Sequence, residues 1–230
     1  MTFTLIGHCH KRNQLGIGIA TYSLAVGGYC PFINPKVAAV STQAFANPQL
    51  GPLAMRLLEM GFSPEKVVKE LESHDPYHEY RQIGIVDKNG QVAGKTGDNT
   101  LPWSGHSIGE GYVAMGNVLS GSQVVEEMAA TYENGKELDL EERILRSIEA
   151  GRDAGGQPQG QRSAALIIYD REDYALMDLR VDAHEEPIAE LCRVYALYKQ
   201  YIPLYYDLRS KEPHIAPTQE EWERMHQIRT

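Results

Sequence analysis

The hydrophobic residues of the chain follow two periods, one typical of strands and one typical of helices. Over residues 15–23, large aliphatic residues alternate with Gly16, Gly18 and Ala20, so one face of the predicted strand is bulky and the other nearly bare. A bare face usually means that another backbone packs closely there. Residues 3–9 precede this strand across a polar turn and form the first predicted strand. We expect the two strands to pair antiparallel within one sheet.

The helical period occurs in two segments, and each segment predicts a pair of helices. In the first segment, Ser63 is a suitable N-cap and Pro64 occupies the first helical position of the second helix. In the second segment, Ser120 and Gln123 have the spacing of a capping box. Asp139 is a candidate cap for the helix that follows.

Further strands are predicted between and after the two helix pairs. The clearest local signal is Asn89-Gly90, which predicts a tight hairpin turn between residues 82–87 and 91–96. The other predicted strands are residues 37–45, 112–116, 163–169 and 174–181. A last helix is predicted from Pro187 to about Gln200.

The order of these elements is strands, helix pair, hairpin strands, helix pair, two strands and a helix. This order differs from the regular alternation of a parallel doubly wound fold, and two largely antiparallel sheets covered by helices satisfy it. We therefore predict an α+β fold arranged as a four-layer αββα sandwich. Residues 1–200 would form this domain, and residues 201–230, rich in Pro, Glu and Tyr, would form a C-terminal arm.

Composition and charge exclude several classes of function. The chain has 230 residues, of which 42% are apolar and 23% charged, as in globular proteins. The formal net charge is −9 and the longest basic run is Lys11-Arg12, so we expect no nucleic-acid partner. No apolar run approaches the roughly 20 residues of a membrane-spanning helix, and no signal-peptide layout is present, so we expect no membrane partner. Cys9, Cys30 and Cys192 form an odd, widely spaced set that suits reduced thiols in the cytoplasm.

Several short phrases occur in order along the chain. They are Thr2-Phe3-Thr4, Leu24-Ala25-Val26-Gly27, Ser41-Thr42-Gln43-Ala44-Phe45-Ala46-Asn47-Pro48, Gly109-Glu110-Gly111, Gly116-Asn117-Val118-Leu119, Gln161-Arg162-Ser163-Ala164-Ala165-Leu166 and Asp178-Leu179-Arg180-Val181-Asp182. Their ordered combination resembles the uncharacterised N-terminal-nucleophile (Ntn) hydrolase-like proteins known as domain of unknown function 1028. The resemblance implies a proteasome-subunit-like αββα fold.

The chain departs from this family at one position. Relatives often carry a basic residue where this chain has Tyr22, between Thr21 and Ser23. In hydrolases of this fold a lysine near the nucleophile commonly assists proton transfer, and no lysine lies in the second predicted strand. The departure weakens a direct transfer of a proteasome-like mechanism to this chain.

Thr2 is the main catalytic candidate. If Met1 is removed, the threonine hydroxyl becomes the nucleophile and its own α-amine, which titrates near pH 8, becomes the base. Asn117 is a candidate donor to the oxyanion, because side-chain amides take that role in acyl transfer. The alternative is that Thr2 only begins an edge strand.

Polar residues near the predicted strand ends are candidates for binding a substrate. We expect Thr42, Gln43, Asn47 and Asn117 to point into one pocket near Thr2. Arg81 or Arg180 is a possible anchor for a substrate carboxylate, which an arginine fork suits. The alternative is that the polar residues cap turns and satisfy buried backbone groups.

No metal or cofactor is expected. His8 and His10 share one face of a predicted strand, but the sequence fixes no further ligand beside them. Asp178, Asp182 and His184 surround Arg180, which favours an ion-pair network. The glycines at positions 16 and 18 lack the third glycine and the acidic residue of a dinucleotide site.

Two classes of function follow. The first is a hydrolase that cleaves a small amide or peptide bond through an acyl-threonine. The second is a non-catalytic member of the fold that binds a small molecule or serves as an assembly subunit. The many tyrosines of residues 195–206 favour a homodimer or larger homo-oligomer with the arm near its interface, although this segment could equally fold back on its own domain.

Overall fold

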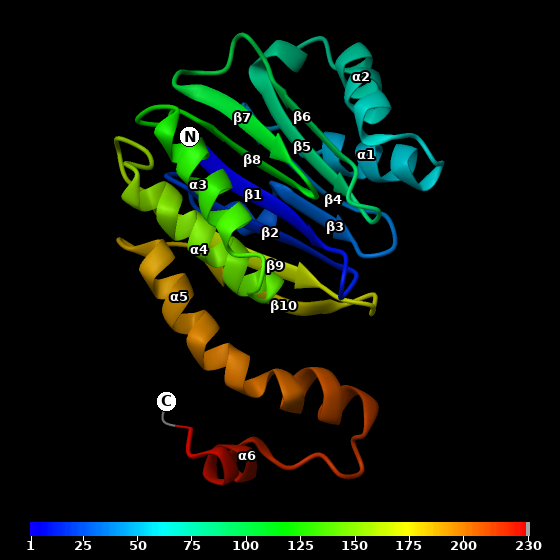
Figure 1. The fold of residues 1–230 in the computed structure, drawn as a ribbon, viewed down its shortest axis with the longest axis vertical. Helices are drawn as coiled ribbons and strands as arrows, with labels where there is room; N and C mark the ends of the chain where they lie inside the picture. The colour runs from blue at the N-terminus through cyan, green and yellow to red at the C-terminus, as the bar shows by residue number, and fades with distance from the viewer. Residues whose placement is uncertain (229–230) are drawn as a thin grey trace.

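The computed structural model describes residues 1–228 and contains two antiparallel sheets, the larger of which has six strands (Figure 1). In spatial order the larger sheet runs β10-β9-β2-β1-β8-β7. Its strands are β1 (Thr2–Cys9), β2 (Gln14–Thr21), β7 (Ser104–Gly109), β8 (Tyr112–Asn117), β9 (Ser163–Tyr169) and β10 (Ala175–Val181). The expected antiparallel pairing of the first two strands is confirmed, with Thr2 opposite Thr21.

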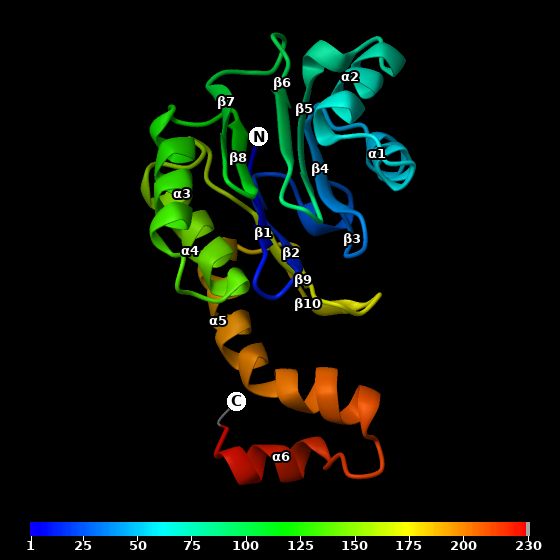
Figure 2. The same cartoon turned by 45° about the vertical axis from the view of Figure 1, so that its right-hand side comes forward.

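The smaller sheet has four strands in the order β3-β4-β5-β6 and faces the larger sheet (Figure 2). Its strands are β3 (Pro31–Asn34), β4 (Ala38–Ala44), β5 (Arg81–Asp87) and β6 (Val92–Thr96). Aliphatic side chains from both sheets meet in one buried cluster, which includes Ile17, Ile19, Val113 and Val86. The two sheets are therefore packed directly on each other.

Helices cover the outer faces of the two sheets (Figures 1 and 2). The helices beside the smaller sheet are α1 (Leu50–Glu59) and α2 (Pro64–His74), and those beside the larger sheet are α3 (Gln123–Asn134), α4 (Leu140–Asp153) and α5 (Pro187–Tyr198). The prediction of an α+β protein with two antiparallel sheets is confirmed. Within residues 1–228, no helix combines the length and the apolar character that crossing a membrane requires.

Side chains of β1 alternate between the helices and the space between the sheets. Phe3 and Leu5 belong to the core formed with α3 and α4, whereas Ile6 belongs to the cluster between the sheets. The Thr4 hydroxyl donates to Gln43 of the smaller sheet, so the even-numbered residues of β1 face that sheet. Thr2 shares this face because it lies two residues from Thr4.

The bare face of β2 is covered by helix side chains, not by another backbone as we expected. A Cβ placed on Gly18 would lie 2.5 Å from Cγ2 of Ile144, and one on Gly16 would lie 2.6 Å from Cδ1 of the same residue. Both contacts are shorter than side chains tolerate. The glycines of β2 therefore allow α4 to pack closely on the larger sheet.

The structure differs from the sequence-based prediction in several elements. Strands β3 and β7 were not predicted, and β2 ends at Thr21, two residues early. Ser63 caps α2 as expected, by accepting from Lys66 N. Ser120 accepts from the Gln123 side chain at 3.2 Å, but α3 begins after Ser122. Asp139 precedes α4 without a capping hydrogen bond and instead pairs with Arg12.

The C-terminal segment forms a helical extension that projects from the sheets (Figure 1). After α5 it contains a 3-10 turn (Lys199–Tyr201), a π-helix (Pro203–Arg209) and α6 (Gln219–His226). Trp222 of α6 packs on Tyr201 and Leu204 in a small separate cluster. Tyr195 and Tyr206 belong to the main core, so part of the tyrosine-rich segment folds back on its own domain.

Candidate functional site

A row of polar residues crosses the larger sheet at the Thr2 end of the space between the sheets. Strand register places Ser163 opposite Thr21, Thr21 opposite Thr2, Thr2 opposite Asn117, and Asn117 opposite Ser104. Residues directly opposite each other in a sheet share a face. These five residues, which we call the polar row, therefore line one edge of the space between the sheets, and Thr2 is at their centre.

The Thr2 hydroxyl lies within reach of a second hydroxyl. Its Oγ1 donates to the Met1 carbonyl at 2.6 Å and lies 3.2 Å from Oγ1 of Thr21. The Thr21 hydroxyl donates to the same Met1 carbonyl. Thr2 is only 5% exposed, so this pair of hydroxyls is withdrawn from bulk solvent.

The space in front of Thr2 disfavours charge. Burial lowers the pKa of the Met1 α-amine below its ordinary value of 8.0, although the neighbouring Cys30 opposes this shift. Burial also raises the pKa of the Cys30 thiol to about 12, and the amine opposes that shift in turn. Cys30 is therefore a neutral thiol at physiological pH, and an amine placed here loses its proton more readily than one in water.

A network of side-chain amides joins the polar row to the smaller sheet. The Thr4 hydroxyl donates to Gln43 Oε1 at 2.6 Å, and Gln43 Nε2 donates to Gln82 Oε1 at 2.7 Å. Asn117 Nδ2 donates to the same Gln82 oxygen at 3.1 Å. The Gln82 amide nitrogen donates in turn to Thr96 Oγ1 at 2.8 Å and to the carbonyl of Gly116 at 2.9 Å. Since all of these groups are bonded, the network fixes the orientation of Asn117 beside Thr2.

Unusual backbone conformations gather at the same end of the sheets. Ala44, the last residue of β4, has φ of 72°, and Val118, directly after β8, has φ of 54°. Ala25, in the loop after β2, has φ of 55°. Positive φ is a true outlier for a β-branched residue such as valine. Such residues cost about 1 to 3 kcal/mol each and cluster at functional sites.

Some of the predicted site residues belong to the polar network, and others lie outside it. Gln43 and Asn117 lie together in the network, both almost fully buried. Thr42 is fully buried on the opposite face of β4, because adjacent residues in a strand point in opposite directions. The expectation that Thr42 and Gln43 share one pocket conflicts with this alternation. Asn47 accepts from Gln49 N at 3.2 Å and shapes the turn before α1.

Both predicted carboxylate anchors already hold a carboxylate of the protein. Arg81 Nε lies 2.8 Å from Asp75 Oδ2, and Arg81 also donates to the carbonyl of Phe45. Hydrogen bonding and the charge of Arg81 outweigh burial and hold the pKa of Asp75 below its ordinary value. Arg180 forms two hydrogen bonds to Asp178, at 2.7 and 2.8 Å. Neither guanidinium is directed at Thr2 by these contacts.

Sequence reasoning missed part of the site. Thr4 was not singled out, and Thr21, Gln82 and Ser104 carry no local motif. Each acquires its place through pairing with a distant strand. The one available signal was the recurrence of a polar residue at the end of an otherwise apolar strand. Within residues 1–228, no three His, Cys, Asp or Glu side chains come together as a set of metal ligands.

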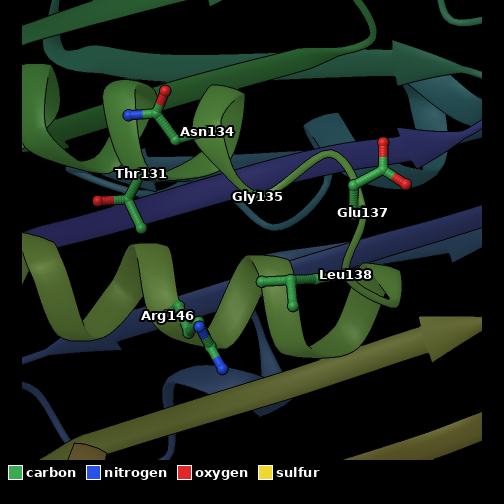
Figure 3. A pocket seen from close by; sticks show the side chains of 6 residues that line it. All are labelled: Thr131, Asn134, Gly135, Glu137, Leu138 and Arg146. Atoms are coloured by element: carbon green, nitrogen blue, oxygen red, sulfur yellow. The ribbon is translucent and has the colours of Figure 1, made fainter.

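Cavities lie away from Thr2 as well as near it. One of about 380 Å³ lies in the α3–α4 hairpin and is lined by Thr131, Asn134, Leu138 and Arg146 (Figure 3). Another, of about 550 Å³, is lined by residues of α2, β6 and β7, including Lys95 and His106. A third, of about 470 Å³, is lined by residues before β9 and after β10, at the sheet end that holds Thr2.

Comparisons with solved structures identify similar folds. A crystal structure of protein SPO2555 from Silicibacter pomeroyi has a TM-score of 0.79 and 27% sequence identity, over 85% of this chain and 88% of that chain. Anbu (ancestral beta-subunit) from Yersinia bercovieri has a TM-score of 0.40 and 11% identity, over 87% and 96%. Anbu from Hyphomicrobium sp. strain MC1 has a TM-score of 0.39 and 12% identity, over 87% and 97%. The two Anbu likenesses are too low to support an assignment.

Sequence comparisons place the chain in a family. No curated protein matches it. A family of unknown function, DUF1028, matches residues 2–191, and the protein from Silicibacter pomeroyi is described by the same family name. Because the match spans most of the 230 residues, the chain belongs to the family of unknown function DUF1028.

Proposed function

We propose that the chain is an Ntn-type hydrolase with a four-layer αββα sandwich and with Thr2 as its nucleophile. The observation that supports this proposal most strongly is the polar row. It concentrates hydroxyl and amide groups around Thr2 at one edge of the space between the sheets. The strained backbone at Ala44 and Val118 lies at the same edge. The substrate would be a small molecule with an amide or peptide bond.

In this proposal Met1 is removed and the α-amine of Thr2 becomes free. The amine would take the proton of the Thr2 hydroxyl while Oγ1 attacks the amide carbonyl carbon. The surroundings that lower the pKa of the Met1 amine would also favour a neutral, basic Thr2 amine. Because the amine acts as base, the mechanism requires no lysine in β2.

The remaining steps use other groups of the polar row. Asn117 or a backbone N–H would donate to the oxyanion of the tetrahedral intermediate. The proton held by the amine would pass to the leaving nitrogen as the C–N bond breaks and the acyl-threonine forms. Water would then attack the ester, releasing the carboxylic acid and restoring the threonine hydroxyl. Thr21, at 3.2 Å from Thr2 Oγ1, would orient the nucleophile.

Two measurements test the proposal. Intact mass of the protein from its native host should show that Met1 is missing. Thr2→Ala should reduce amidase activity, found by screening small amides, by at least about 1,000-fold, because removing a nucleophile leaves only the binding contribution. Thr42→Ala is the matched control, since Thr42 lies on the other face of β4, and it should retain activity. Retention of Met1, or an active Thr2→Ala variant, would contradict the proposal.

A non-catalytic role is the second candidate, and specific contacts favour it. The hydroxyls of Thr2 and Thr21 are both occupied by the Met1 carbonyl, and the Asn117 amide is occupied by Gln82. A protein that kept Met1 would hold this arrangement permanently and would bind a small molecule or serve as an assembly subunit. For either candidate we propose a cytoplasmic homodimer or larger homo-oligomer, with a domain of residues 1–200 and an arm of residues 201–230.

A further inference from the structure

The cavity of about 470 Å³ is built by two segments that flank β9 and β10. Its lining includes Gln159, Gln161 and Arg162 before β9, and His184 and Glu185 after β10. We infer that this cavity binds a small-molecule carboxylate and that Arg162 is its anchor. The inference concerns binding alone. The further step, that the carboxylate belongs to the amide substrate, rests on the proposed hydrolase function.

Backbone hydrogen bonds fix the cavity beside the polar row. Arg162 N donates to the carbonyl of Thr21 at 2.7 Å, and His184 N donates to the carbonyl of Arg162 at 2.9 Å. Arg162 directly precedes Ser163, which is separated from Thr2 by β2 alone. Since neighbouring strands lie about 4.8 Å apart, Ser163 and Thr2 are roughly 10 Å apart. The cavity therefore lies at the same end of the larger sheet as Thr2.

Arg162 is exposed and forms no ion pair with a carboxylate among residues 1–228. Among residues 1–228, no carboxylate oxygen lies within 4.0 Å of its guanidinium nitrogens. Its guanidinium carbon lies 5.6 Å from the centroid of the Tyr22 ring, within the usual range of a cation–π contact. Tyr22 therefore holds the guanidinium at the sheet end while leaving its hydrogen-bond donors available for an anion.

The cations of the other two cavities differ from Arg162 because each of them pairs with a carboxylate of the protein. In the cavity near α2, Lys95 lies 2.8 Å from Glu72 and 3.2 Å from Glu79. In the cavity of Figure 3, Arg146 lies 2.5 Å from Glu142. The cations in those two places already have carboxylate partners, so they attract an added carboxylate less strongly.

The other side chains of the cavity complete a site rich in donors. The amides of Gln159 and Gln161 supply N–H donors, and a planar guanidinium binds a carboxylate in a bidentate manner. Nδ1 of His184 accepts from Glu186 N at 2.9 Å, so a neutral ring carries its proton on Nε2. Glu185 is the single acidic side chain of the lining and suits a donor on the ligand, such as an amide N–H. The chemical class that fits is a small N-acylated amino acid.

The inference is tested by binding of matched pairs of probes to the full chain. The carboxylates are N-acetylglycine, N-acetyl-β-alanine and N-acetyl-γ-aminobutyrate, and each neutral partner is the corresponding primary amide. Dissociation constants are measured by ligand-observed NMR at pH 7. At least one carboxylate should bind at least tenfold more tightly than its neutral partner, and its affinity should fall as salt is added.

Arg162→Gln should reduce binding of that carboxylate at least tenfold and abolish its preference over the amide. The matched control is Arg171→Gln, an exposed arginine at the opposite end of β9, which should bind within twofold of the unsubstituted protein. Thermal unfolding of both variants checks the fold. If Arg162→Gln does not fold, Arg162→Lys takes its place and should keep the preference with lower affinity.

The outcomes separate this inference from the proposed function. Equal binding of carboxylates and amides, no binding of any probe, or equal behaviour of Arg162→Gln and Arg171→Gln would overturn the inference. Thr2→Ala should bind the carboxylate as the unsubstituted protein does. Carboxylate binding through Arg162 in a protein that keeps Met1 and shows no amidase activity would sustain the inference while contradicting the hydrolase.

Discussion

The two ends of the space between the sheets are closed in different ways. At one end, the polar row and the Gln43–Gln82 network gather hydroxyls and amides from both sheets. At the other end, β1 contributes His8, which lies against the turn of the β5–β6 hairpin at Gly90. Between them the same faces carry aliphatic residues such as Ile6 and Ile17. Both ends exclude solvent, but only the Thr2 end uses an extended polar network.

This difference indicates that the polar network is not required to close the space between the sheets. At the His8 end, Nε2 of the imidazole is buried without a hydrogen-bond partner within residues 1–228, with His10 and Asp87 close enough to affect its pKa. Buried polar groups stabilise a fold less than apolar packing does, and they carry a large penalty if any member is left unbonded. An extended network with a strained residue, Val118, directly beside it therefore suits a chemical role better than a packing role.

Apolar packing between the two sheets, in the cluster that contains Ile17, should contribute the largest share of the free energy of unfolding. Ile17→Ala removes a fully buried side chain and should lower the free energy of unfolding by about 2 to 5 kcal/mol, because the cavity it leaves collapses only partly. Ile108→Ala on β7 is the matched control, because Ile108 is 48% exposed, and should change stability by about 0.5 kcal/mol or less. Urea unfolding followed by circular dichroism measures both. Equal losses of unfolding free energy in the two variants would show that the aliphatic cluster between the sheets is not the main source of stability.

The polar network should contribute less to stability than the aliphatic cluster. Gln82→Met has a similar volume but leaves the Gln43 and Asn117 amides without their acceptor, so it should cost about 1 to 3 kcal/mol. Gln91→Met, in the exposed hairpin turn, is the matched control and should have almost no effect. The same urea titrations compare the variants. If Gln82→Met loses as much stability as Ile17→Ala, the network serves mainly to stabilise the fold. If it loses none, the network does not fix the orientation of Asn117.

Most of the fold could be predicted from the sequence because its elements carry strong periodic patterns. The Asn89-Gly90 turn and the aliphatic alternation of residues 15–20 each determine a local structure. Strand β7, Ser104–Gly109, was missed because its residues are mostly small or polar and half-exposed, as suits the edge of a sheet. Strand β3 was missed because it begins with Pro31 and has only four residues.

The candidate site was less predictable, for a physical reason. Thr2 and Asn117 were singled out from the chain, but Thr21 and Ser104 join them only through the register of long-range strand pairs. Alternation along β4 and β5 then decides which neighbours reach the site, placing Gln43 and Gln82 inside and Thr42 and Arg81 outside. Arg162 could not be predicted as a binding residue, because its cavity is formed by two segments that are distant in the sequence.

The smallest expected effect is a pH dependence of the free energy of unfolding that arises from His8. It tests the contrast between the Thr2 end and the His8 end. Burial lowers the pKa of His8 below its ordinary value of 6.5, and the neighbouring His10 adds to this shift while Asp87 of β5 opposes it. The unfolded chain therefore binds the proton more tightly than the folded chain. As the pH falls below about 6.5, protonation draws the equilibrium toward the unfolded state, so the free energy of unfolding should decrease.

His8→Gln removes this contribution, so its stability should change less than that of the unsubstituted protein between pH 7.5 and pH 5.5. The measurement is a series of urea unfolding curves across this range, with His214→Gln, an exposed histidine of the arm, as the matched control. The control should retain the pH dependence of the unsubstituted protein. The side chains of the polar row at the Thr2 end are uncharged, and the Met1 α-amine at that end, whose pKa is lowered, is present in every variant, so the difference between variants isolates the His8 end. If the free energy of unfolding of His8→Gln depends on pH as steeply as that of the unsubstituted protein, the buried imidazole of His8 is not held in a neutral form. The contrast between the two ends of the space between the sheets would then be wrong.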